Sequence, residues 1–298
     1  MSTYKGQAIS IDSQLQNLIE KGLTIDNYEY AHNWLTNVSS YRLKKYTYTF
    51  KDDDSLNFTT GTSFEQIIDL YLFDRKLKLI LFDAIETIEV SVKSLISHLM
   101  SLKHGTHWYL DSSHFSDTFE YNKFIDKIKD EFLEQEEPGV QRYRKFISEP
   151  ELPPSWMMIE FITLGTVSKM FEYLTSRQEK QEICKIFNLP ENIFISWLHS
   201  FTHQRNRCAH HQRIVYRTIK HDILLPSRIK HSFLKDTDSI SRSSLYCSIL
   251  CMIHLIKKIN PESKFRQSLL SLIKESPQIN FSKMGFIDNW EFEPIWHT

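Results

Sequence analysis

Seven consecutive residues, numbers 205–211, combine two arginines, an amide and two imidazoles directly after a run with helical apolar periodicity. Arg205 and His210 have the spacing Arg-x4-His. Arginine supplies a permanent positive charge for phosphate, and histidine exchanges a proton near neutral pH. This pair suits metal-free cleavage of RNA. A base takes the proton of a ribose 2′-hydroxyl, the oxygen attacks the adjacent phosphorus, and a cation stabilises the phosphorane oxygens.

Arg-x4-His arises by chance in many chains, so the surrounding residues must carry the interpretation. The stretch RNRCAHHQR at 205–213 resembles the signature of HEPN domains, a helical superfamily rich in ribonucleases, and more narrowly that of the Abi-like (Abi-2 group) proteins of bacterial abortive infection. Further segments resemble the same family: YRLKKYTYTF at 41–50, YLFDRKL at 71–77 with IETIEV at 85–90, GTHWY at 105–109, and MGFIDNW at 284–290. Lys44 and Lys45 depart from the small or glycine pair usual in the family, and Ile287 replaces a proline.

The resemblance implies an all-α fold, a HEPN-type helical bundle with additional N- and C-terminal helices. We expect one domain over residues 1–298: an aromatic helical segment at 1–60, the bundle with the motif at 61–225, and C-terminal helices at 226–298. The resemblance also implies a toxin-like role in phage defence, RNA as the substrate, and no cofactor. The low count of 7 glycines and 9 prolines independently favours helices.

The resemblance also suggests a role for each residue of the motif. We expect Arg205 to bind the scissile phosphate, His210 to move the proton, and Asn206 to position one of them. A helix-terminal pair without function is the alternative for Arg205 and His210. Supporting roles or RNA contacts are expected for three neighbours: Arg207, His211 and Arg213.

Helix geometry constrains how these groups can meet. Five residues rotate an ideal helix by about 140° beyond a full turn, so Arg205 and His210 would not share a face, whereas Asn206 and His210 would. We therefore expect the helix predicted over 191–209 to loosen near Ala209, or the site to be shared between subunits. The chain contains no second Arg-x4-His. Two motifs then require two chains, which predicts a homodimer.

The aromatic segment at 41–50 has two interpretations. Tyr46 and Tyr48 could stack RNA bases while Arg42 contacts phosphate. Alternatively, these rings pack in the core where the first helices dock. The segment is too aromatic and β-branched to predict a helix with ease.

The acidic residues of the next segment also have two interpretations. Asp74, Arg75, Glu86 and Glu89 could form a polar shell that orients the catalytic groups across the bundle. The alternative is pairing within the helix, because Asp74 to Lys78 and Glu89 to Lys93 are both i,i+4.

Two helices are predicted from local patterns. Ser63 and Gln66 form a capping box, and neither glycine nor proline occurs from Thr62 to His104. A continuous helix of that length would measure about 60 Å, so we expect a kink or break. Ser155 is predicted to cap one helix that continues to Leu174.

The net charge of −1 excludes a global polycation, but the positive charge is concentrated locally. Residues 201–235 hold eight Lys or Arg, five His and one acid, Asp222. A second interpretation of this basic stretch is a non-cleaving protein that binds a structured or small non-coding RNA, with such an RNA or an antitoxin as its partner. A third is a metal site, because His199 and His203 lie one helical turn apart, although no nearby carboxylate or thiolate completes it.

The remaining features bear on location. The four cysteines form no C-x-x-C and no regular framework, so we expect reduced thiols in the cytoplasm. Residues 1–6 lack the apolar core of a signal peptide, and the uncharged run at 243–256 is shorter than the roughly 20 residues that a bilayer needs. We expect no membrane association.

Overall fold

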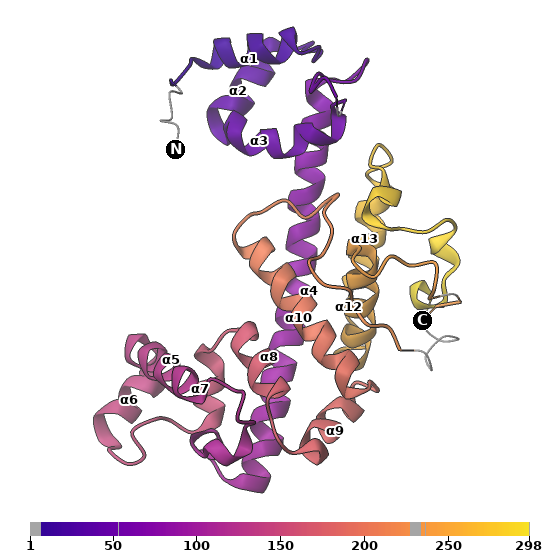
Figure 1. Cartoon of the computed structure of the whole chain (residues 1–298). Coiled ribbons are helices and arrows are strands. Elements are labelled where there is room, and N and C mark those ends of the chain that lie inside the picture. Colours follow the sequence, from indigo (N-terminus) through magenta and orange to yellow (C-terminus); the bar gives the residue numbers. More distant parts are fainter. Residues whose placement is uncertain (1–6, 53, 227–233, 236, 298) are drawn as a thin grey trace.

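A computed structural model describes residues 7–52, 54–226, 234–235 and 237–297 of the chain (Figure 1). Within these ranges the protein consists of α-helices and short 3-10 turns, with isolated β-bridges and no strand. The predicted all-α class is therefore confirmed. The helices form one continuous hydrophobic core around a long central helix.

The central helix α4 spans Phe64–His104, 41 residues or about 60 Å. It begins at the predicted capping box of Ser63 and Gln66 and ends at Gly105, whose φ is 87°. The expected break does not occur, because α4 is one uninterrupted helix. Different helices cover successive parts of it, so its apolar stripe is buried along its whole length although the molecule is elongated (Figure 1).

Three short helices pack at the amino end of α4 (Figure 1). They are α1 (Ile11–Glu20), α2 (Tyr28–Val38) and α3 (Ser40–Thr47). The aromatic segment at 41–50, whose composition does not by itself predict a helix, is thus largely helical. Ser39 caps α3, and Leu43, Tyr46 and Thr47 bury its inner face. Tertiary packing against α4 outweighs the weak intrinsic helix propensity of the segment.

Five helices lie at the carboxyl half of α4, where α7, α8 and α9 pack on it and α5 packs on α7. They are α5 (Tyr121–Glu134), α6 (Pro138–Phe146), α7 (Ser155–Phe161), α8 (Leu164–Glu172) and α9 (Arg177–Ile186). The single helix predicted from Ser155 to Leu174 is wrong, because it is divided into α7 and α8. The chain is extended at Ile162, and the Thr163 side chain then accepts the amide of Thr166, which starts a new helix.

The last helices complete the core. They are α10 (Glu191–Ala209), α12 (Leu245–Ile259) and α13 (Phe265–Lys274). The predicted bounds of α10 are confirmed. α10 lies against α4, α8 and α12, and at Gly165 of α8 an added Cβ would be 3.1 Å from Thr202 Cγ2. The absence of a side chain at Gly165 therefore permits the close approach of α8 to α10.

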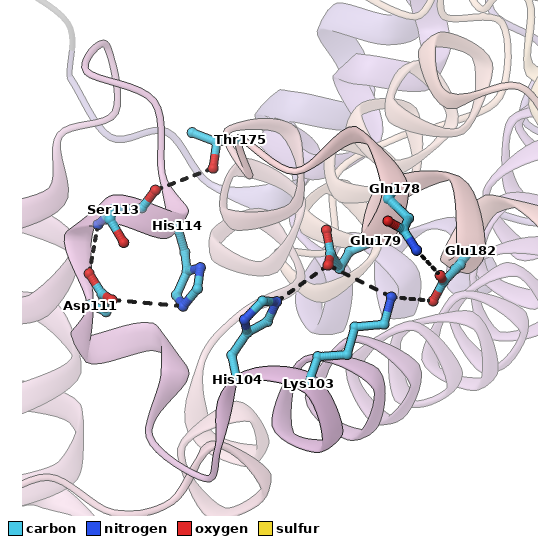
Figure 2. A network of polar contacts seen from close by, with 9 residues as sticks. All are labelled: Lys103, His104, Asp111, Ser113, His114, Thr175, Gln178, Glu179 and Glu182. Carbon is cyan, nitrogen blue, oxygen red and sulfur yellow. Dashed lines mark hydrogen bonds and ion pairs between the residues drawn. The ribbon is translucent and has the colours of Figure 1, made fainter.

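Charged side chains hold the carboxyl end of α4 against α9 (Figure 2). Lys103 Nζ lies 2.7 Å from Glu182 Oε2 and 3.7 Å from Glu179 Oε1. His104 Nε2 also lies 3.3 Å from Glu179 Oε1. The ring of His104 is in turn 4.4 Å from that of His114, centroid to centroid. This polar network fixes the end of α4 that is remote from the Arg-x4-His motif.

The four cysteines are buried free thiols. Burial raises the pKa of Cys184 and that of Cys208 to about 12, so both thiols stay protonated at neutral pH. None of the helices in the described part of the chain is long and apolar enough to cross a membrane.

The MGF turn at 284–286 secures the start of α12. Gly285 adopts φ 88°, in the left-handed region, and a methyl group at this residue would overlap the side chain of Ser244. Ser244 caps α12 by accepting the amide of Cys247 at 3.1 Å. Glycine is thus required both for its backbone conformation and for its lack of a side chain.

Gly285→Ala should therefore lower the free energy of unfolding by about 2–4 kcal/mol, combining left-handed strain with steric overlap. Urea unfolding followed by circular dichroism would measure the loss. Gly139→Ala is the matched control, because Gly139 lies inside α6 with no atom within 4 Å of an added Cβ. Equal stability of the two variants would contradict this account of the turn.

Candidate functional site

The motif lies where α10 ends. The helix stops at Ala209, His210 follows at φ −87° and ψ 15°, and His211 is left-handed at φ 52°. The amide of His211 donates to the Cys208 carbonyl at 3.0 Å, and that of Gln212 to the Arg207 carbonyl at 2.8 Å. This is the Schellman arrangement of a helix end, with histidine in the position where glycine is common. The predicted loosening near Ala209 is confirmed.

Arg205 points toward α4, whereas Asn206 and His210 are exposed. Arg205 Nε lies 3.8 Å from Glu89 Oε2, an ion-pair distance too long for a hydrogen bond, and the guanidinium is 6.0 Å from the Phe82 ring centroid. The Arg205 side chain remains 33% exposed. One side of the arginine is therefore held by the protein, and another can reach a ligand.

Glu89 connects two cations. Its Oε1 is 3.0 Å from Lys93 Nζ, while its Oε2 faces Arg205. The side chains of Glu89 and Lys93 are 12% and 9% exposed, so the pairing is shielded from water. Glu89 thus pairs with Lys93 within α4 and also lies at ion-pair distance from Arg205. Glu86, one turn earlier, is exposed.

Asp74 anchors the chain after the motif. Its side chain is fully buried, and Oδ1 accepts the amides of Ile214 and Val215, each at 2.9 Å. Oδ2 accepts the Tyr46 hydroxyl at 2.8 Å and lies 2.8 Å from Lys78 Nζ. Burial, followed by the charge of Asp74, raises the pKa of Tyr46, so that hydroxyl stays protonated as a donor. Asp74 therefore joins three segments of the fold.

The structure corrects part of the predicted RNA-contact set. Tyr46 is only 1% exposed and bonds Asp74, so its ring cannot stack on a base. Tyr48 is 52% exposed. Arg75 is exposed on α4, away from the buried carboxylate of its neighbour Asp74, so it does not belong to the same network.

Two arginines tie α3 to the chain after the motif. Arg42 Nη1 donates to the carbonyl of His211 at 3.2 Å, and Arg213 Nη1 donates to the carbonyl of Lys45. These contacts use backbone acceptors, so they fix the position of the segment without neutralising either charge. Arg42 on α3 and Arg213 after the motif thus link these two segments. The side chain of His211 is exposed.

Cations cluster beside the motif. Burial lowers the pKa of Arg207, and the nearby charge of Arg217 lowers it further. Burial and then Arg217 likewise lower the pKa of Arg213. Arg217 therefore acts electrostatically on both Arg207 and Arg213, and we call these three residues the arginine cluster. Arg217 was not singled out from the sequence, although it belongs to the basic stretch at 201–235. Arg228 and Lys230 of that stretch lie outside the described residues.

The two histidines considered for metal have other surroundings. His199 Nε2 is 3.1 Å from Glu172 Oε2 of α8. Burial lowers the pKa of His203, which Arg207 lowers further, so this imidazole is neutral at neutral pH. Throughout the described ranges, no three His, Cys, Asp or Glu side chains are grouped as metal ligands would be.

Fold and site together define an all-α protein in which a helix ending in Arg-x4-His packs on a long helix that supplies its acidic partners. The model of the Abi-like protein family matches residues 33–216, more than half of the chain, and the chain belongs to this family. The matched range contains α4, α10, Asp74 and the motif, and it ends just beyond Val215. Comparison with curated proteins and with solved structures gives no match.

Asp74→Asn should lower the free energy of unfolding by about 2–4 kcal/mol, because it leaves Lys78 buried without its counter-ion and presents a donor where two donors point. Hydrogen exchange at the amides of Ile214 and Val215 should accelerate. Asp83→Asn, at an exposed residue of the same helix, is the control and should change stability by less than about 0.5 kcal/mol. Equal free energies of unfolding for the two variants would exclude Asp74 as the anchor of the chain after the motif.

Proposed function

We propose that this protein acts in bacterial abortive infection as a HEPN-type endoribonuclease that needs no metal ion. Membership of the Abi-like family supports the defence role, since that is the role the family name denotes. The observation that carries the chemistry is the placement of Arg205. It is half-enclosed by Glu89 and Phe82 and still partly exposed, five residues before an exposed imidazole.

In this mechanism His210 accepts the proton of a ribose 2′-hydroxyl. The 2′-oxygen attacks the adjacent phosphorus, and Arg205 stabilises the negative charge on the phosphorane oxygens. The bond to the 5′-oxygen then breaks, and that oxygen takes a proton. The products are a 2′,3′-cyclic phosphate and a 5′-hydroxyl. Asn206, exposed one turn before His210, positions the imidazole or the substrate.

The arginine cluster gives this site affinity for RNA. The charge of Arg217 lowers the pKa of both Arg207 and Arg213, so a bound phosphate would offset this repulsion. The acidic partners Glu89 and Asp74 are both shielded from solvent. They hold the cationic segment in place without presenting exposed negative charge to the substrate.

The active form in this proposal is a homodimer. Arg205 faces α4 whereas His210 is exposed beyond the helix end, and the sequence contains one Arg-x4-His. A second copy of the chain would bring a second motif to the same phosphate. The RNA substrate and the reduced, buried cysteines are both consistent with a cytoplasmic location.

The second candidate is a protein that holds a structured or small non-coding RNA without cutting it, alone or together with an antitoxin. One observation favours this candidate: the charge of Arg205 is partly satisfied by Glu89. Both candidates use the arginine cluster, so RNA affinity alone does not separate them. Proton transfer by His210 does.

Arg205→Ala and His210→Ala should each abolish cleavage of cellular RNA in the presence of chelator, at least 100-fold below wild type. RNA affinity of His210→Ala should stay within a few-fold, because the arginine cluster is unchanged. Analysis of product ends from the wild type should find 2′,3′-cyclic phosphate. His221→Ala is the control, since His221 is an exposed imidazole of the same basic stretch. Intact, co-purifying RNA with all four proteins would favour the binding candidate.

Glu89→Gln should lower kcat by about 10-fold to 100-fold while changing KM less, because it removes the charge that orients Arg205 without removing Arg205 itself. Single-turnover kinetics would separate the two effects. Glu86→Gln, one turn away and exposed, is the matched control. An unchanged kcat in Glu89→Gln would show that the 3.8 Å contact with Arg205 has no role in catalysis.

A further inference from the structure

The outer face of α3, together with the first residue of the 3-10 turn that follows it (Tyr48–Phe50), carries two tyrosines and two lysines. Tyr41 is 76% exposed and Tyr48 is 52% exposed, and Lys44 and Lys45 between them are exposed too. The spacing i, i+3, i+4 and i+7 places all four on one helical face. Lys45 Nζ lies 5.6 Å from the centroid of the Tyr41 ring. We call this set, Tyr41, Lys44, Lys45 and Tyr48, the α3 face.

The opposite side of α3 is fixed in the core. Leu43, Tyr46 and Thr47 are buried, and the Tyr46 hydroxyl bonds Asp74 at 2.8 Å. Exposed aromatic rings on a helix held in this way lose little conformational freedom when a ligand binds them. The α3 face is therefore a rigid platform.

The α3 face is continuous with the proposed catalytic site. Arg213 donates to the carbonyl of Lys45, a member of the face, and Arg42 donates to the carbonyl of His211 at 3.2 Å. The residue next to His210 is thus bound directly to α3. A chain of RNA bound at the motif could pass over Arg213 onto the α3 face.

The local charge favours an anion. Burial lowers the pKa of Lys51, and the nearby charges of Lys21 and Lys44 lower it further, so cations gather beside the α3 face. The acidic loop that follows in the sequence begins at Asp52, whose carboxylate accepts the amides of Asp54 and Ser55 at 3.2 Å and 2.9 Å. That carboxylate is engaged within its own turn.

We propose that the α3 face binds two unpaired nucleotides of the RNA substrate beside the cleaved bond, with bases stacked on Tyr41 and Tyr48 and phosphates paired with Lys44 and Lys45. The two tyrosines are seven residues apart, about 10 Å along the helix, which is a distance that a short extended single strand spans. Stacking requires unpaired bases, so the ligand is single-stranded RNA. That the bound RNA is the substrate rests on the proposed function, whereas the binding of single-stranded RNA by the α3 face does not.

The test measures binding of a fluorescein-labelled uridine decamer by anisotropy, with His210→Ala as the background to prevent cleavage. Replacing Tyr41 and Tyr48 together by alanine should weaken binding at least about tenfold, whereas replacing both by phenylalanine should leave it within about twofold. Replacing Lys44 and Lys45 together by alanine should reduce the slope of log K against log salt by about 1.4, that is 0.7 for each lost phosphate contact.

The matched control is Phe146→Ala on α6. Phe146 is 67% exposed, and Lys145 Nζ lies 5.2 Å from the centroid of its ring. This pair resembles Tyr41 and Lys45 but belongs to α6, on a different part of the molecule. Thermal melting followed by circular dichroism should show all variants folded. A loss with Phe146→Ala equal to that of the tyrosine pair, or an equal loss for duplex RNA, would overturn the proposal.

The outcomes for the α3 face and for catalysis are separable. Tight binding that needs both tyrosines, together with no cleavage by the wild type, would retain the α3 face and reject the nuclease. Normal cleavage and unchanged affinity in the tyrosine pair variant would reject the α3 face and retain the nuclease. An RNA affinity that is unchanged in every variant would also reject the α3 face as an RNA-binding site.

Discussion

The buried carboxylate of Asp74 is the interaction on which the site depends. A charge in the core is stable only when each of its oxygens is satisfied, and Asp74 achieves this with Tyr46, Lys78 and the amides of Ile214 and Val215. Those donors come from α3, α4 and the segment after α10. The requirement to solvate one charge therefore fixes the relative positions of three segments that together surround the motif.

The long helix α4 holds the motif at two levels. Glu89 contacts Arg205 before α10 ends, and Asp74 holds Ile214 and Val215 after it ends. Because both carboxylates belong to one unbroken helix, their separation is set by the helical rise. The turn that carries His210 is thus fixed on both sides, although the side chain of His210 is exposed. Rigidity around an exposed imidazole is what a proton-transfer group requires.

Charge is divided between the interior and the surface in a consistent way. The acidic partners Asp74 and Glu89 are shielded within α4, while Arg207, Arg213 and Arg217 of the arginine cluster follow one another in and after the motif. A protein of net charge −1 can therefore present a locally cationic surface. The backbone carbonyls that receive Arg42 and Arg213 add to this, because they fix the guanidinium groups without cancelling their charge.

The sequence by itself determined the all-α class, the bounds of α10, the capping box of α4 and the loosening at Ala209, because periodicity, caps and helix geometry are local properties. Only the tertiary structure decided that Tyr46 is a buried donor and Tyr41 an exposed ring, and that Glu89 reaches Arg205. It also decided that α4 is unbroken. These depend on which helix faces meet, and residues 140 apart, such as Asp74 and Ile214, leave no local pattern of their pairing.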